Sequence, residues 1–151
     1  MLTLRTCFQL VFGFLFLCLI PFQALGSPLG SDQNGNGIWD DLDRVYGQLS
    51  GQSFIAAQQL AVSMQDFTMA PPGNQSLALE GMRKSQEALL CLYALQGESG
   101  KATAKNLQGA LLANPLRAER FNQNQQTILG QEIPFDPDPE KWGQYCPFSL
   151  I

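Results

Sequence analysis

Oxygen-bearing side chains recur at regular intervals in one short window of the sequence, from Asp32 to Asp43. Numbered from Asp32, side-chain oxygens stand at positions 1, 3, 5, 9 and 12, and Gly37 stands at position 6. Calcium takes about six to eight oxygen ligands at flexible distances, and a loop with this spacing supplies them around a glycine turn. The window therefore predicts a calcium site. The expected ligands are the side chains of Asp32, Asn34, Asn36, Asp40 and Asp43 and the backbone carbonyl of Ile38.

The acidic residues of this window favour a cation for a second reason. Asp32, Asp40, Asp41 and Asp43 lie together without a basic residue among them, so their carboxylates would repel one another in the absence of a cation. Parts of the pattern also have simpler causes. Asp40 and Asp41 stand where a helix begins, and a helix N-terminus favours negative charge. Residues 34–37 are typical of a flexible turn. Neither cause accounts for the whole spacing.

The same window resembles the EF-hand-like loops of exported proteins, of which thrombospondin type 3 and dockerin calcium loops are the most similar. The resemblance covers these residues alone and implies calcium binding by them. The sequence departs from the family pattern in having one copy, no preceding helix, Asn at positions 3 and 5, and Asp at position 12. We therefore expect a weak structural site, with a dissociation constant of about 10⁻⁴–10⁻³ M. The layout also resembles small exported bacterial proteins with one such loop before a helical domain, which implies no function.

The composition restricts the functional classes. Histidine is absent, which removes the commonest general base, every Ser-His or Cys-His nucleophile pair and most zinc sites. The formal net charge is -4, so no electrostatic attraction to nucleic acid is expected. We predict a non-enzymatic binding or structural module, with calcium and a protein or cell-envelope component as partners. The alternative is a hydrolase of the cell envelope that uses carboxylates alone.

A second acidic cluster lies between prolines near the end of the sequence and comprises Asp136, Asp138 and Glu140. It could form a second cation site or half of a glycosidase-like carboxylate pair. A solvated turn is the simpler interpretation, which we adopt. Neighbouring Trp142 and Tyr145 are expected to pack against the domain, with a groove for a peptide or sugar as the alternative.

Residues 1–26 have the pattern of a secretory signal peptide. Arg5 supplies the positive start, residues 10–22 are nearly continuously apolar, and Ala24 and Gly26 are small residues at the spacing for cleavage before Ser27. The apolar run is short for a membrane span of about 20 residues. We therefore expect a periplasmic or secreted protein that would contact a membrane only through an uncleaved signal.

The cysteines divide between the leader and the mature domain. Cys7 and Cys18 lie in the leader, whereas Cys91 and Cys146 remain after cleavage. An even pair in an oxidising compartment is typical of a disulfide. Two buried free thiols are the alternative. The sequence predicts a bond between Cys91 and Cys146 that closes a long loop.

Residues 27–151 are predicted to form a single all-α domain of four or five helices, because apolar residues recur with helical spacing. Helices are expected over about 40–49, 54–67, 74–96, 101–113 and 115–130. Their apolar faces are expected to comprise Leu42, Val45, Tyr46, Leu49, Phe54, Ala57, Leu60, Ala61, Met64, Phe67, Leu77, Gly81, Ala88, Leu92, Leu95, Leu107, Ala110 and Leu111. The last helix is expected to run through Leu116, Phe121 and Ile128.

The helix ends carry recognisable signals. Asn74 and Asn114 are expected N-caps, with Pro115 at a first helical position, and Gly97 is an expected C-cap. Four prolines then make residues 131–151 an irregular strap, which we expect to cross the helices in extended form. The basic groups Arg83–Lys84, Lys101/Lys105 and Arg117/Arg120 are expected to be solvated surface charge.

Overall fold

The computed structural model describes residues 27–148, and within that range every regular element is a helix. These elements are α2 (Asp40–Tyr46), α3 (Gly51–Met69), α4 (Gln75–Gln96), α5 (Glu98–Leu112), α6 (Pro115–Thr127) and a 3₁₀ helix, η2 (Pro139–Tyr145). The predicted all-α class, with an irregular C-terminal segment, is confirmed. The signal-peptide prediction for residues 1–26 lies outside the described residues.

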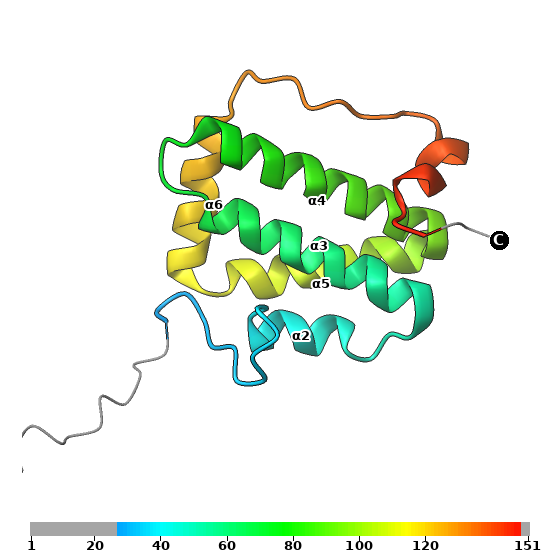
Figure 1. Ribbon diagram of the computed structural model, residues 1–151, viewed down its shortest axis with the longest axis horizontal. Coiled ribbons are helices and arrows are strands. Elements are labelled where there is room, and N and C mark those ends of the chain that lie inside the picture. Colours follow the sequence, from blue (N-terminus) through cyan, green and yellow to red (C-terminus); the bar gives the residue numbers. More distant parts are fainter. Residues whose placement is uncertain (1–26, 149–151) are drawn as a thin grey trace, which may run out of the picture.

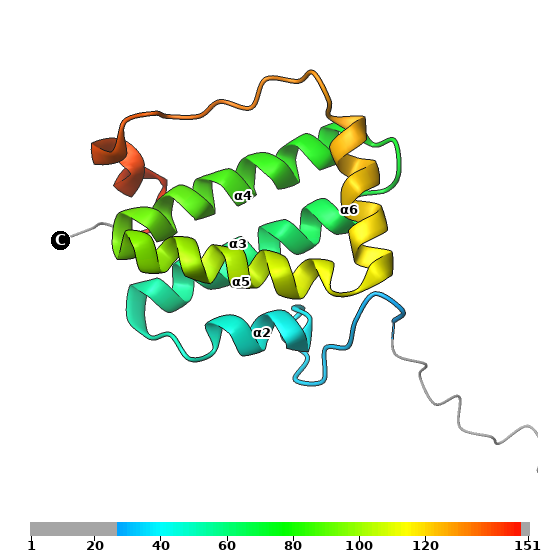
Figure 2. The same cartoon turned by 180° about the vertical axis from the view of Figure 1, so that it is seen from behind.

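Three long helices form the body of the domain. Figure 1 shows α3 and α4 side by side and antiparallel, with α5 returning along them. Helix α6 crosses one end of this layer and contacts all three, while α2 packs against α3 and α5 on the side away from the C-terminal strap (Figures 1 and 2). None of the helices in the described part of the chain is long and apolar enough to cross a bilayer.

The two predicted asparagine caps are present. The side chain of Asn74 accepts a hydrogen bond from the Leu77 N–H at 3.1 Å, which satisfies a free amide in the first turn of α4. Asn114 accepts from the Leu116 N–H at 2.9 Å, and Pro115 occupies the first position of α6. Polar side chains therefore fix where both helices begin.

The core forms where α3, α4 and α6 meet. The fully buried ring of Phe67 packs edge-to-face on Phe121, with ring centroids 4.9 Å apart. Gly81 allows α4 to approach α3 closely, because a Cβ at this position would lie 2.8 Å from Phe67 Cα. The fully or nearly fully buried apolar residues include Leu42, Tyr46, Ala57, Leu60, Ala61, Cys91, Leu92, Leu107 and Leu111.

One leucine predicted to be buried is exposed instead. Leu77 is 51% exposed, and Ala78 takes the buried position in the first turn of α4. Gly81, Ala88 and Leu92 are buried as predicted, so the expected face of α4 is right beyond its first turn. In α6 the buried residues include Arg117 and Phe121, whereas Leu116 is 45% exposed.

Helix α5 begins three residues earlier than expected, at Glu98 rather than Lys101. Gly97 ends α4 and also precedes α5, so a single residue joins the two helices. The sequence between Gly97 and Gly100 has the composition of a loop, which explains the misplaced boundary. In the structure Gly100 is buried in a close contact with the backbone of Leu92.

The C-terminal strap is extended for only part of its length. Residues 131–138 have no regular structure and pass over α4, whereas Pro139–Tyr145 forms η2 (Figure 1). The prediction of extended structure throughout was wrong here, because proline at the first position of a helix costs no hydrogen bond. The ring of Trp142 packs on Tyr93 with centroids 6.0 Å apart, which confirms packing at this residue.

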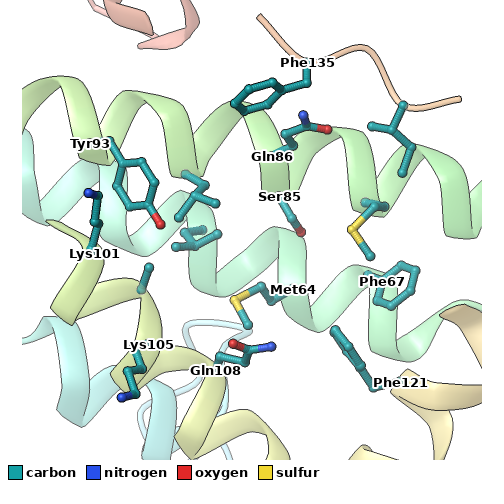
Figure 3. Close-up of a pocket in the computed structure, with 15 residues that line it drawn as sticks. Met64, Phe67, Ser85, Gln86, Tyr93, Lys101, Lys105, Gln108, Phe121 and Phe135 are labelled. Carbon is teal, nitrogen blue, oxygen red and sulfur yellow. The ribbon is translucent and has the colours of Figure 1, made fainter. Parts of the chain in front are cut away.

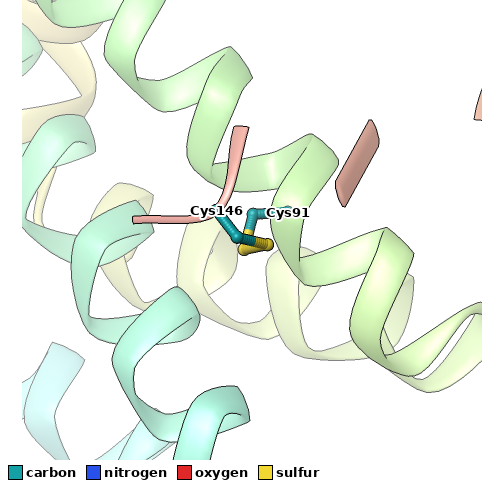
Figure 4. The surroundings of a disulfide bond; sticks show 2 residues. All are labelled: Cys91 and Cys146. Carbon is teal, nitrogen blue, oxygen red and sulfur yellow. A yellow bond between two sulfur atoms is a disulfide. The ribbon is translucent and has the colours of Figure 1, made fainter. Parts of the chain in front are cut away.

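The disulfide fixes the strap to α4. Cys91 on α4 and Cys146 just after η2 are joined by an S–S bond of 2.06 Å, with Cα atoms 4.9 Å apart (Figure 4). This bond fits the predicted pairing of the two cysteines. The bond holds the end of the strap against the fully buried side of α4.

Candidate functional site

The window from Asp32 to Asp43 is an irregular segment that leads into α2 and is anchored at its centre. The side chains of Ile38 and Trp39 are buried in the hydrophobic core. The side chain of Gln65 on α3 forms two hydrogen bonds to the backbone around them. Its Nε2 donates to the Gly37 carbonyl at 2.7 Å, and its Oε1 accepts from the Trp39 N–H at 3.1 Å. The middle of the loop is therefore held by the helical body.

Asp32 organises the turn at Gly37. One carboxylate oxygen accepts from the Asn36 N–H at 3.1 Å, and the other accepts from the Gly37 N–H at 2.8 Å. Gly37 has φ of +83°, in the left-handed region that favours glycine. Gly37 therefore lies in a turn of the chain, and this turn brings the first residue of the window close to the fifth and sixth.

Asp43 is the point on which the remaining side chains converge. The side-chain amides of Asn34 and Asn36 both donate to Asp43 Oδ2, at 2.8 Å and 2.9 Å. Its other oxygen, Oδ1, accepts from the hydroxyl of Tyr46, one helical turn later. Positions 1, 3, 5 and 12 of the window are thus linked through Asp32, Asn34, Asn36 and Asp43.

Asp40 and Ile38 take other positions. The Asp40 carboxylate accepts from the Ser31 hydroxyl at 2.7 Å and the Gln33 N–H at 2.9 Å, so it ties the lead-in segment to the start of α2. The hydrogen bond from Ser31, followed by that from Gln33, holds the pKa of Asp40 below its ordinary value. The Ile38 N–H donates to Asn36 Oδ1 at 2.8 Å.

Arg117 was predicted to be surface charge, and this was wrong. Its side chain is 3% exposed, and its Nη1 donates to Asp41 Oδ2 at 2.7 Å. Its Nε donates to the Leu29 carbonyl, and the guanidinium lies over the Trp39 ring at 4.1 Å from the centroid. Arg117 therefore fastens the N-terminal segment to α6 by an ion pair, a hydrogen bond and a cation–π contact.

The ion pair changes the electrostatics that the sequence suggested. Asp41 is neutralised by Arg117, so mutual repulsion concerns only Asp32, Asp40 and Asp43. Each of these three carboxylates also accepts hydrogen bonds. Asp32 accepts from backbone N–H groups, Asp40 accepts from Ser31 and Gln33, and Asp43 accepts from side chains. Charge repulsion alone is thus a weaker argument for a cation than the sequence indicated.

The donor atoms of the loop suit a hard cation. Within residues 27–148 there is no group of three or more His, Cys, Asp or Glu side chains placed to hold a metal. The linked set instead combines the carboxylates of Asp32 and Asp43 with the amides of Asn34 and Asn36. All of these side chains carry oxygen donors, which calcium prefers, and none carries sulfur or imidazole nitrogen.

Three residues that shape this site were not predicted for it. Tyr46 was assigned only to the apolar face, although its spacing of three residues from Asp43 on a helix could have shown the contact. Gln65 and Arg117 are far away along the chain, and no local pattern marks them. Their roles follow from the packing of α3 and α6 against the loop.

The second acidic cluster is used locally. Asp138 accepts from the Glu140 N–H at 3.1 Å and so caps η2, and it pairs with Lys141 at 3.2 Å. Asp136 accepts from the Asp138 N–H at 3.0 Å and, through Oδ2, from Gln144 at 3.3 Å. These contacts agree with the interpretation of the segment as a solvated turn.

Comparison with protein-family models, with curated proteins and with solved structures finds no match to this chain. The candidate site therefore has to be interpreted from its own geometry.

Proposed function

We propose that this is an exported, non-enzymatic helical protein whose N-terminal loop binds one calcium ion. The observation that carries the proposal is the convergence of Asn34 and Asn36 on Asp43 at the start of α2, with Asp32 joined to this group through the Asn36 N–H. These are the side chains at positions 1, 3, 5 and 12 of a loop with calcium spacing. Asp40 and the Ile38 carbonyl are the further proposed ligands, at positions 9 and 7.

The asparagines could change from donors to ligands by rotation of their amides, which exchanges the oxygen and the NH₂ group. This rotation would break the hydrogen bonds that Asn34 Oδ1 accepts from the Asn36 N–H and that Asn36 Oδ1 accepts from the Ile38 N–H. The NH₂ groups of Asn34 and Asn36 now face Asp43 Oδ2, so rotation would present oxygens to a cation beside that carboxylate. Because Tyr46 bonds to Oδ1, Asp43 would bind through Oδ2 alone, in keeping with a weak site.

Calcium at this loop would stabilise the whole domain rather than the loop alone. Gln65 joins the centre of the loop to α3, and the Arg117–Asp41 pair joins the start of α2 to α6. An ion that fixes the loop would therefore also order the segment that these two side chains hold. We assign calcium a structural role on this basis.

The expected stabilisation is measurable even for a weak site. With a dissociation constant of about 10⁻⁴–10⁻³ M, calcium at about 10 mM adds about 1.4–2.7 kcal/mol to the free energy of unfolding. Extracellular calcium sites lie in this range of affinity. The proposal therefore places the protein in a periplasm or outside the cell, where the Cys91–Cys146 disulfide would also persist.

The helical body would act by binding a protein or cell-envelope partner. The acidic cluster near the C-terminus does not favour the hydrolase alternative, since Asp136 and Asp138 are engaged in turn and cap hydrogen bonds. Calcium would contribute to such binding by holding the N-terminal segment in one conformation.

The test is thermal unfolding in EDTA and at calcium concentrations up to about 10 mM. The wild type is compared with an Asp32→Ala/Asp43→Ala variant, which removes both linked carboxylates. A Glu119→Ala/Glu132→Ala variant is the matched control, because it removes two exposed carboxylates outside the loop. We expect calcium to raise the melting temperature of the wild type and the control, and to leave the loop variant unchanged.

Equal calcium responses in all three proteins would contradict the proposal and leave the window as an acidic turn. Export is tested separately by N-terminal sequencing of protein collected from the periplasm or medium after expression of the full chain. Ser27 is the expected first residue, and a chain that stays in the cell with residues 1–26 attached would contradict export.

A further inference from the structure

A pocket of about 480 Å³ lies between α3, α4, α5 and α6 and beside the strap. Figure 3 shows side chains from all of these segments pointing into it. It is separate from the candidate calcium loop, none of whose residues lines it. Its volume lies within the range of about 300–1,000 Å³ that small-molecule sites occupy.

Most of the pocket wall is apolar. Met64 and Phe67 on α3, Met82 and Leu89 on α4, and Phe121 on α6 form the inner surface. The strap contributes Ile133 and Phe135 at the outer edge. Phe135 is 57% exposed, which leaves a large apolar ring facing water beside an apolar hollow.

One end of the pocket is positively charged. Figure 3 shows Lys101 and Lys105 near Tyr93 at this end, whereas Phe67 and Phe121 lie at the other. No acidic residue in the described part of the chain lines the pocket, although the protein has 13 acidic and 9 basic residues. Lys101 pairs with Glu98, while Lys105 has no ion pair within residues 27–148.

We propose that this pocket binds a single-chain anionic amphiphile of the fatty-carboxylate class. The alkyl chain would lie along the methionine and phenylalanine wall, and the carboxylate would meet Lys105 and Lys101 at the charged end. Each methylene that is removed from water contributes about 0.8 kcal/mol, so an apolar wall of this extent supplies the binding energy. The two ammonium groups supply the preference for an anion.

The arrangement of the strap agrees with this occupant. A chain bound along the wall would cover the ring of Phe135, which lines the pocket and is 57% exposed. The disulfide between Cys91 and Cys146 holds the far end of the strap, so the extended segment that carries Ile133 and Phe135 stays beside the pocket. The site is thus bounded on its outer side by the chain itself.

The test is calorimetric titration of the purified full-chain product with dodecanoate, below its micelle concentration. We expect saturable binding with one site per chain. Decanoate should bind about tenfold more weakly, because it lacks two methylenes. Dodecyltrimethylammonium, which has the same tail length and the opposite charge, should show no saturable binding.

Two pairs of variants locate the site. Lys101→Ala/Lys105→Ala should weaken dodecanoate binding by about tenfold or more, whereas Lys141→Ala, which removes an exposed lysine outside the pocket, should not. Ala104→Phe fills the pocket from α5 and should abolish binding. Ala102→Phe places the same ring on the exposed side of α5 and should leave binding unchanged. Unaltered melting temperatures and helical circular dichroism show that each variant is folded.

Several outcomes would overturn the proposal. If dodecanoate shows no saturable binding, the proposed ligand class is wrong. If dodecyltrimethylammonium binds equally well, the pocket has no preference for an anion. If Ala104→Phe binds dodecanoate as the wild type does, the ligand does not bind in this pocket. Self-association of the wild type that Ala104→Phe prevents, without dodecanoate binding, would make the pocket an interface between copies. The Asp32→Ala/Asp43→Ala variant should still bind dodecanoate, so this proposal and the calcium proposal can fail independently.

Discussion

The guanidinium of Arg117 on α6 donates to the carboxylate of Asp41 on α2 at 2.7 Å and joins two residues that are 76 positions apart. The same side chain bonds to the Leu29 carbonyl and covers the Trp39 ring. One buried cation therefore connects the lead-in segment, the start of α2 and α6.

Arg117→Met should lower the free energy of unfolding by about 1.5–3 kcal/mol, because it leaves Asp41 and the Leu29 carbonyl without their donor. Chemical denaturation measures the change. Arg120→Met is the control and should change stability by no more than about 0.5 kcal/mol, since Arg120 is only half-buried. A double-mutant cycle with Asp41→Asn should show a coupling energy above about 0.5 kcal/mol, and additive effects would contradict the proposed ion-pair contribution.

Gly81→Ala and Gly109→Ala should change stability in opposite directions. A Cβ at Gly81 would lie 2.8 Å from Phe67 Cα, so the substitution pushes α4 from α3 and should cost about 1–3 kcal/mol. A Cβ at Gly109 meets nothing within 4 Å, so alanine there should add up to about 1 kcal/mol through helix propensity. Denaturation midpoints of the two variants test this, and a stabilising Gly81→Ala would show that the two helices are not in close contact.

The sequence predicted the helices and their caps well, because these depend on local chemistry. Asn74 and Asn114 cap helices because their side chains accept hydrogen bonds from free backbone N–H groups in the first helical turn. The apolar period identifies a helix without any knowledge of what packs against it. The phase of that period is less secure at the first turn of a helix, which explains why Leu77 was predicted to be buried.

The contacts of the candidate site were harder to predict, because they depend on how the helices pack. The sequence around Arg117 in α6 has the features of an exposed helix face, and only the packing of the loop against α6 brings the carboxylate of Asp41 to it. Gln65 likewise has no local feature that would indicate its two bonds to the loop backbone. The loop spacing itself could be recognised, since Gly37 and its neighbours are contiguous in the chain.

Reduction of the Cys91–Cys146 disulfide should lower the free energy of unfolding by about 4 kcal/mol, because the bond closes a loop over a sequence separation of 55. Denaturation with and without dithiothreitol measures this. Trypsin should also cut after the exposed Lys141 faster once the strap is released. The free energy of unfolding of a Cys91→Ser/Cys146→Ser variant should not change when dithiothreitol is added. The same result for the wild type would show that the bond does not form.

Because of Tyr46, the protein should become less stable at alkaline pH. Burial, followed by the hydrogen bond to Asp43, raises the pKa of the Tyr46 phenol above its ordinary value of 10.0. A raised pKa means that the folded state holds the proton more tightly, so this stabilisation is complete below pH 10 and is lost as the pH rises further. Chemical denaturation between about pH 8 and about pH 12 should show that the free energy of unfolding falls as the pH rises. The Tyr46→Phe variant should lack this decline. Parallel curves for the two proteins would exclude this role of Tyr46.

Asp43→Asn should weaken calcium-dependent stabilisation and also lower the stability of the calcium-free protein, because its NH₂ group would replace the Oδ2 acceptor of the Asn34 and Asn36 amides. Asparagine retains an oxygen that can accept the hydrogen bond from Tyr46, but it lacks the charge that calcium requires at the end of the loop. We expect the calcium concentration for half-maximal stabilisation to rise by about tenfold, which corresponds to about 1.4 kcal/mol. Melting temperatures across a calcium series measure this. Asp66→Asn, which removes an exposed charge on α3, should match the wild type. If Asp43→Asn responds to calcium as the wild type does, Asp43 is not a ligand, and the convergence of Asn34 and Asn36 on it serves only to close the turn.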